Sequence, residues 1–157
     1  MKTLDFTKLN AESAKNIVGE LSQLLADFQI YYTNLRGFHW NVRGKDFYVM
    51  HAQFEDMYNN AAEKIDEIAE RILMLDGVPA HNFSEYLTKS KISETGYVSG
   101  SDNAIQHIME STGYFLELER KILKLASEAN DEATAALMSD YIKEQEKQLW
   151  MFTAYLS

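Results

Sequence analysis

The chain has 157 residues, 46% of them hydrophobic, and it contains no cysteine, so disulfide frameworks and thiolate metal sites are excluded. This size predicts one domain, residues 1–157, with a sizeable buried core, and one proline and seven glycines indicate a mainly helical chain. The net charge of −9, without any block of Lys or Arg, disfavours binding to DNA, because the phosphate backbone repels an acidic surface.

The first predicted helix begins after Asn10, whose side chain can cap it, and runs to about Phe38. Its apolar residues recur every three or four positions and are expected to face inward: Ile17, Leu21, Leu24, Phe28, Tyr31, Leu35 and Phe38. Gly37 costs a helix interior about 1 kcal/mol relative to Ala, which predicts that another backbone or side chain approaches closely here. No stretch of the chain reaches membrane-spanning length, so a cytoplasmic protein without membrane contact is expected.

The second predicted helix takes Asp46 as its N-cap and ends just before Gly77. Its buried face consists of Phe47, Met50, Phe54, Met57, Ala61, Ile65, Ile68, Ile72 and Leu75. Further residues widen this face on one flank, as expected where a helix packs against another subunit: His51, Tyr58, Ala62, Ile65 and Ala69. The remaining charged run has the composition of a solvated helix face: Glu63, Lys64, Asp66, Glu67, Glu70 and Arg71.

Two pairs of metal-binding residue types lie on these helices, but one ion cannot touch both pairs. Asp66 and Glu70 are four residues apart, so they share one side of the second helix and could hold one ion between them. His51 lies fifteen residues before Asp66, which separates the two by roughly 22 Å along the axis. His39 lies twelve residues before His51, across the turn at residues 43–45, so an antiparallel helix pair brings both histidines to the same end.

Neither pair alone supplies the mixed nitrogen and oxygen ligands that are typical of a redox iron site. A two-fold axis that sets the histidine end of one subunit against the carboxylate end of another would complete the ligand set twice, which predicts a dimer. A simpler alternative stays open for each pair. The carboxylates can belong to a solvated helix face, and His51 can be a boundary residue of the apolar stripe.

Residues 76–100 form a long connection with three of the chain's glycines and its one proline, and residues 84–92 predict a short helix within it. Such a connection fits a crossover between two antiparallel helix hairpins, as in ferritin-like bundles. The third predicted helix begins near Ser101 or Asp102 and the fourth after Asn130, so the expected fold is an all-α four-helix bundle. The inward residues are Ile105, Ile108, Thr112, Phe115, Ile122 and Ala126 on the third helix and Leu137, Tyr141, Leu149, Phe152 and Tyr155 on the fourth.

A di-iron site inside one helix bundle usually draws on Glu-x-x-His motifs from two helices. This chain contains no such motif, which argues against a site within one subunit. His81 in the long connection and His107 on the third helix have no carboxylate at a ligand-like spacing, so both are expected to be structural.

The joint spacing of several short motifs is similar to the signature of the Dps family, the dodecameric mini-ferritins. The motifs are His39-Trp40-Asn41-Val42-Arg43-Gly44, Phe47 with His51, Phe54-Glu55, and Asp66-Glu67-Ile68-Ala69-Glu70-Arg71. The resemblance implies a ferritin-like bundle and a ferroxidase centre, di-iron or mononuclear, between two-fold-related subunits. It implies His39 and His51 of one chain and Asp66 and Glu70 of the other as metal ligands, with Trp40 as an oxidisable neighbour behind them. The alternative for Trp40 is a packing role.

By the same resemblance, Fe(II) is oxidised with hydrogen peroxide as the preferred oxidant, and ferric mineral is stored inside a hollow dodecamer, which protects against oxidative stress. Asp131 and Glu132 match acidic residues that line iron-entry pores in the family, whereas Ala136 stands where an acid is common. The alternative for both acids is a favourable interaction with the helix N-terminus. Two other functions stay open: DNA compaction, which the charge disfavours, and assembly of a helical bundle without chemistry.

Overall fold

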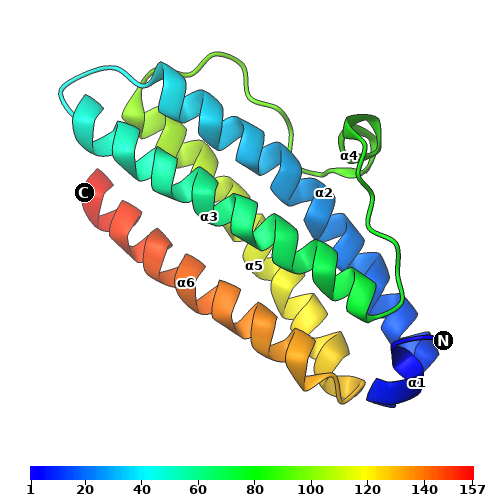
Figure 1. The fold of residues 1–157 in the computed structure, drawn as a ribbon. Coiled ribbons are helices and arrows are strands. Elements are labelled where there is room, and N and C mark those ends of the chain that lie inside the picture. The colour runs from blue at the N-terminus through cyan, green and yellow to red at the C-terminus, as the bar shows by residue number, and fades with distance from the viewer.

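The computed structural model describes residues 1–157 and consists of six helices with no β-strand. The helices are α1 (Leu4–Thr7), α2 (Ala11–Asn41), α3 (Phe47–Met74), α4 (Phe83–Lys89), α5 (Ser101–Glu128) and α6 (Glu132–Leu156). The four long helices lie side by side as a bundle, with α1 at one end and α4 outside it against α2 (Figure 1). The predicted four-helix bundle with a short extra helix is confirmed. None of the helices combines the length and the apolar character that crossing a membrane requires.

Helix α2 follows its predicted pattern from cap to core. Asn10 Oδ1 accepts hydrogen bonds from the backbone N–H of Glu12 and of Ser13, each at 3.0 Å, which satisfies two donors of the first helical turn. All the predicted inward residues, from Ile17 to Phe38, are buried. They join one cluster of 30 buried side chains that fills the space between the long helices.

The predicted N-cap of α3 is confirmed, but part of the inward stripe predicted for α6 is wrong. Asp46 is the N-cap residue of α3, although its side chain caps no backbone group. Instead, Asp46 Oδ2 accepts a hydrogen bond from the Tyr155 hydroxyl at 2.8 Å, and this bond keeps Tyr155 exposed at the end of the bundle rather than inward. Leu137 and Leu149 are only half-buried. The buried stripe of α6 is partly polar: Thr134, Met138, Tyr141, Gln145 and Phe152.

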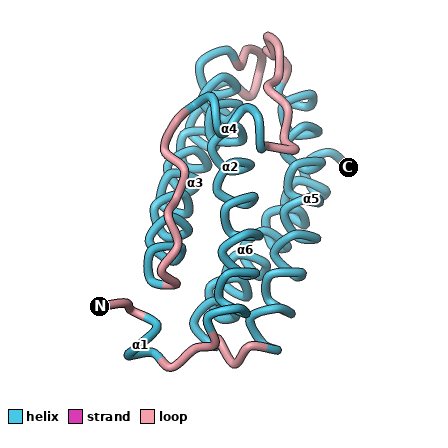
Figure 2. Tube along the Cα trace, turned by 90° about the vertical axis from the view of Figure 1, so that its right-hand side faces the viewer, coloured by secondary structure: helices cyan, strands magenta, loops and turns pink.

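The long connection between α3 and α5 runs along the outside of the bundle (Figure 2). Polar side chains of α2 hold it there. The buried Asp27 carboxylate accepts hydrogen bonds from the Lys91 backbone N–H at 2.6 Å, the Ser90 hydroxyl at 3.0 Å and the Tyr114 hydroxyl at 2.8 Å. Burial, together with the bond to Asp27, raises the pKa of Tyr114. Asn34, two turns along α2, bonds the next part of the connection. Because the bonds to Asp27 begin directly after α4, this helix ends before residue 92, earlier than predicted.

Helix α1 is absent from the sequence-based predictions. The Asp76 carboxylate, just past the end of α3, accepts hydrogen bonds from the backbone N–H of Thr3 at 2.9 Å and of Leu4 at 3.0 Å. The bond from Leu4 is the main reason that the pKa of Asp76 lies below its usual value. No local pattern in the first ten residues points to this contact, because its acceptor lies far along the chain.

Gly77 lies in a crowded place and Gly37 in an open one, so adding a methyl group to each should change the free energy of unfolding in opposite directions. A Cβ at Gly77 would lie 2.7 Å from Val18 Cγ1 and 2.8 Å from Ile72 Cγ2, and both neighbours are stiff β-branched side chains. At Gly37 no atom beyond the neighbouring residues and the backbone of α2 itself lies within 4 Å of the added carbon, so the close approach predicted there is absent within the subunit. Gly77→Ala should lower the free energy of unfolding by about 1–3 kcal/mol, and Gly37→Ala should raise it by up to about 1 kcal/mol. Urea unfolding at fixed protein concentration measures both, and equal effects would contradict the packing at Gly77.

Candidate metal centre

The antiparallel pair α2 and α3 brings His39 and His51 together beside the turn that joins the two helices. Gly44 in this turn has a φ of 121°, a conformation that residues with side chains rarely adopt. The two imidazole rings stack with centroids 3.8 Å apart and planes 19° apart. His39 Nδ1 lies 2.7 Å from the His51 carbonyl oxygen, and His51 Nδ1 lies 2.8 Å from the His39 carbonyl oxygen. The predicted meeting of the two histidines is confirmed.

These reciprocal bonds define which ring nitrogen carries the proton. A carbonyl oxygen can only accept a hydrogen bond, so each Nδ1 must be the protonated, donating nitrogen. In a neutral imidazole the other nitrogen, Nε2, then carries the lone pair with which the ring can bind a metal ion. Bonds of this kind fix the tautomer and the orientation of metal-binding histidines in general. The arrangement therefore favours a ligand role for His51 over that of a boundary residue.

Aromatic side chains pack around the histidine pair. Phe47 stacks on His51 with centroids 5.0 Å apart, and Tyr58 packs edge-on against His39 at 5.3 Å. Tyr32 in turn packs edge-on against Tyr58 at 6.0 Å. Sequence analysis missed Tyr32, although its position two helical turns before His39 places both on the same side of α2. These contacts leave His39 buried and His51 half-buried, so the rings are held in place by packing as well as by hydrogen bonds.

Asp66 lies about four helical turns along α3 from His51 and Glu70 about five, and both side chains are exposed. Within one chain, no three His, Cys, Asp or Glu side chains lie close enough together to hold a metal ion. A centre made of both pairs therefore requires two chains. The flank of α3 between the pairs consists of half-buried Tyr58, Ile65 and Ala69 and exposed Ala62.

Trp40 lies next to His39 in the sequence, but it is a surface residue in the subunit. It is 64% exposed, and its ring lies 5.1 Å from the guanidinium carbon of Arg36, one turn earlier on α2. The same guanidinium lies 5.0 Å from the centre of the Tyr32 ring. Arg36 thus links Trp40 to the aromatic residues around the histidines by cation–π contacts.

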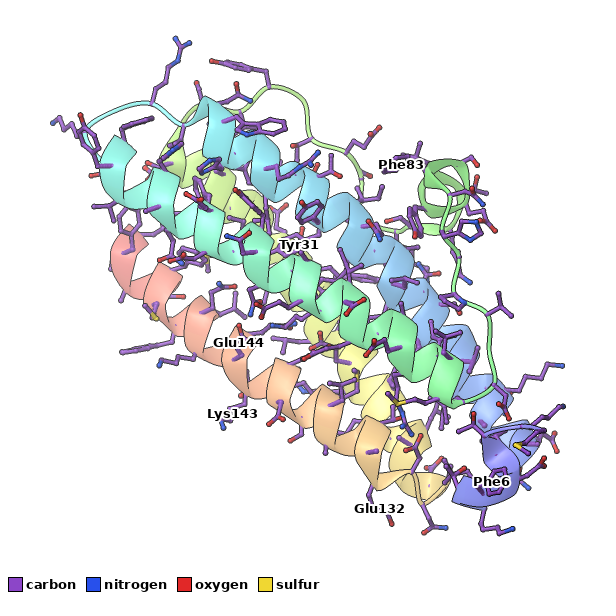
Figure 3. The ribbon with its side chains drawn as sticks, in the orientation of Figure 1. Phe6, Tyr31, Phe83, Glu132, Lys143 and Glu144 are labelled. Atoms are coloured by element: carbon purple, nitrogen blue, oxygen red, sulfur yellow. The ribbon has the colours of Figure 1, made fainter.

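The two predicted pore residues differ in their surroundings. Asp131 is buried; it accepts a hydrogen bond from the Thr134 backbone N–H at 3.0 Å and pairs with Arg71 Nη2 at 2.7 Å. Burial alone would raise the pKa of Asp131, but the hydrogen bonds from Thr134 and the ion pair with Arg71 bring it below its usual value. The Asp131 carboxylate thus fastens α6 to α3, and its role in an iron-entry pore stays a prediction. Glu132 is exposed at the start of α6 (Figure 3).

Two cations in the charged run of α3 are not solvated, contrary to prediction. Lys64 is 4% exposed, and its ammonium lies 2.6 Å from the Glu144 carboxylate of α6. Arg71 is similarly enclosed by its pair with Asp131. Helix α6 supplies acidic partners to this side of α3, which the pattern of α3 alone cannot reveal. The acidic members of the run are exposed as predicted: Glu63, Asp66, Glu67 and Glu70.

Comparisons with known proteins agree with this architecture. The ferritin-like domain family matches residues 18–157. The DNA protection during starvation protein of Porphyromonas gingivalis is 44% identical over 154 residues, which cover 98% of this chain and 97% of that protein. A solved Dps protein from Vibrio cholerae, described as a member of a broad superfamily of ferritin-like diiron-carboxylate proteins, has a TM-score of 0.93 at 44% identity and covers 95% of this chain and 94% of its own.

A Dps protein from Bacillus brevis has a TM-score of 0.90 at 28% identity, with 95% of this chain and 100% of that chain covered. The likeness thus extends over almost the whole length of the chain and of its relatives, in sequence as well as in fold. The resemblance drawn from the histidine and carboxylate motifs is confirmed. The chain belongs to the Dps family of ferritin-like proteins.

Proposed function

We propose that this chain is a ferroxidase, an oxidoreductase acting on metal ions, which oxidises Fe(II) with hydrogen peroxide and stores the ferric product. The iron centre, di-iron or mononuclear, lies between two-fold-related subunits, with His39 and His51 from one chain and Asp66 and Glu70 from the other. The chains form a hollow dodecamer in the cytoplasm. Removing Fe(II) and peroxide together protects the cell against oxidative stress.

The reciprocal histidine pair is the observation that carries this proposal. Its two Nε2 lone pairs offer nitrogen ligands at one place, and their tautomers are set by the bonds of Nδ1. The carboxylates of Asp66 and Glu70 are exposed and unpaired within the subunit, as ligands for a shared ion must be. A mixed set of imidazole and carboxylate ligands suits iron.

The reaction consumes two Fe(II) ions for each molecule of hydrogen peroxide. Each Fe(II) gives up one electron, the O–O bond breaks, and the two oxygen atoms take up protons and leave as water. Because both electrons go to the same peroxide, no hydroxyl radical is released. The side chains bind and orient the ions, while the redox chemistry belongs to the iron itself.

Iron must also reach the inside of the shell. Glu132, exposed at the start of α6, is the residue that we assign to the entry pore. Asp131 beside it holds the helix in place, so the two neighbouring acids have separate tasks. Trp40 is exposed next to His39, and we assign it the role of an oxidisable neighbour of the centre in the assembled dimer.

Stopped-flow absorbance of ferric iron tests the proposed reaction. Hydrogen peroxide is mixed with anaerobic Fe(II) and the purified shell, and we expect oxidation much faster than in buffer, with one peroxide consumed per two Fe(II). Oxygen in place of peroxide should react more slowly. The iron should then elute with the dodecamer in gel filtration. Oxidation no faster than without protein would refute the proposal and leave a helical assembly without chemistry.

DNA binding is expected to be weak or absent. Several relatives carry names that refer to DNA protection, but removing Fe(II) and peroxide protects DNA without any contact. The net charge of −9 opposes binding to phosphate groups. In a gel-shift assay at about 0.15 M salt, the purified shell should not retard duplex DNA. Tight retention that weakens steeply as salt rises would overturn this prediction.

A further inference from the structure

A group of polar side chains lies in the core of the bundle, separate from the histidine pair. Lys64 of α3 is 4% exposed. Its ammonium donates hydrogen bonds to Asn60 Oδ1 and to Glu144 Oε2, both at 2.6 Å, and lies 5.0 Å from the centre of the Tyr141 ring. A buried cation is costly unless it is surrounded by such acceptors. The core therefore contains a place that accommodates positive charge.

Unpaired oxygen atoms lie in the same region. Glu119 of α5 is fully buried and accepts a hydrogen bond from Gln145 Nε2 of α6 at 2.6 Å. Neither Glu119 Oε2 nor Gln145 Oε1 has a hydrogen-bond partner, which is rare for buried polar atoms. Burial raises the pKa of Glu119 to about 8. The Gln145 amide oxygen can thus supply an additional ligand to a cation.

Lys64 and Gln145 line a cavity of about 250 Å³ in the bundle. Its polar lining includes Asn60, Lys64, Glu144, Gln145, Tyr31 and Thr112. The Glu144 side chain is 51% exposed, so the cavity has a polar entrance from solvent on the α6 side. Figure 3 labels Glu144 and Tyr31 near the middle of the bundle's length. Ions can therefore approach the group of oxygen atoms without any unfolding of the bundle.

We propose that the ammonium of Lys64 occupies a cation site formed by Asn60, Glu144 and Gln145, and that it prevents a divalent metal ion from binding in the bundle core. The amide and carboxylate oxygens of this site suit hard divalent ions such as Mg²⁺ and Mn²⁺. Facing helices of a bundle provide such oxygen ligands in other proteins. Here the ammonium takes two of the acceptors and repels a second cation, so divalent ions are confined to the surface of the subunit.

Binding of Mn(II) to the assembled protein tests this inference, which does not depend on the proposed iron oxidation. Lys64→Ala removes the charge and enlarges the cavity. The variant should bind one additional Mn(II) per subunit relative to the unmodified chain, measured by loss of the electron paramagnetic resonance signal of free Mn(II). Anomalous diffraction should place the ion between α3 and α6, and Mn(II) should raise the melting temperature of this variant more than that of the unmodified protein.

Two matched variants show whether the additional ion is held as proposed. Lys64→Arg keeps a cation in the site and should gain no Mn(II). Adding Glu144→Gln, at a half-exposed side chain, to Lys64→Ala should abolish the gain. If Lys64→Ala does not assemble, Lys64→Gln, which removes the charge but retains most of the side-chain volume, should show the same gain. The inference is overturned if assembled Lys64→Ala or Lys64→Gln binds no additional Mn(II). It is also overturned if the additional Mn(II) still binds after Glu144→Gln is added.

Discussion

Replacing His39 and His51 together with Ala is expected to abolish rapid Fe(II) oxidation by hydrogen peroxide, and the same result is expected for Asp66 and Glu70. Each double substitution removes half of the ligands of every centre. Loss of groups that only orient metal ligands lowers metal affinity or activity about 10–100-fold. Loss of two direct ligands should therefore lower the stopped-flow rate by more than about 100-fold. Glu63→Ala, at an exposed carboxylate on the same helix, is the matched control and should leave the rate unchanged.

Shells refolded from a mixture of the two inactive variants should regain activity. In a two-fold dimer with one chain of each kind, one centre loses all four ligands while the other keeps all four. The recovered rate should therefore follow the fraction of mixed dimers. A centre within one chain would give no recovery, because every chain would carry a broken centre. Well-assembled mixed shells that stay inactive would show that the ligands are not shared between subunits.

The histidine half of this centre could be predicted from sequence because its determinants are local. His39 and His51 are twelve residues apart and lie on either side of a short turn. When the two helices pack antiparallel, this spacing brings both histidines to the end of the pair beside the turn. The inward stripe of α2 was predictable for the same reason, since apolar residues at helical spacing bury one face whatever packs on it. The bonds from each Nδ1 to the opposite carbonyl depend on how closely α2 and α3 approach, which spacing alone does not define.

The errors concern polar side chains whose partners lie far along the chain. Lys64 resembles a solvated residue in the pattern of α3 until Glu144, 80 positions later, is placed beside it. Gln145 interrupts the apolar pattern of α6, yet it is buried because Glu119 of α5 accepts its hydrogen bond. Hydrophobic periodicity reports which side of a helix is apolar. It cannot report a buried polar pair, because each member of the pair looks exposed on its own helix.

The ion pair of Arg71 and Asp131 is another such contact, and breaking it should destabilise the fold strongly. Arg71→Met keeps the aliphatic stem but leaves the buried Asp131 carboxylate without its cation. Removing one partner of a buried pair costs about 3–5 kcal/mol of unfolding free energy. The matched control is Arg120→Met, whose pair with Glu146 is exposed on both sides and should cost at most about 1 kcal/mol.

The unmodified chain and Arg71→Met should differ in unfolding free energy by an amount that depends on pH. This dependence follows from the pKa of Asp131, which is lower in the folded chain than its usual value. A carboxyl group with a lowered folded pKa stabilises the fold fully above its unfolded pKa, which is about 3.9, and this contribution is lost as pH falls through the folded pKa. The stability gap between the unmodified chain and Arg71→Met should therefore be large at pH 7 and should shrink below about pH 4. Urea unfolding at fixed protein concentration measures the gap. A gap that widens at low pH, or one no larger than that of Arg120→Met at pH 7, would contradict the role of Asp131 as a buried anion held by Arg71.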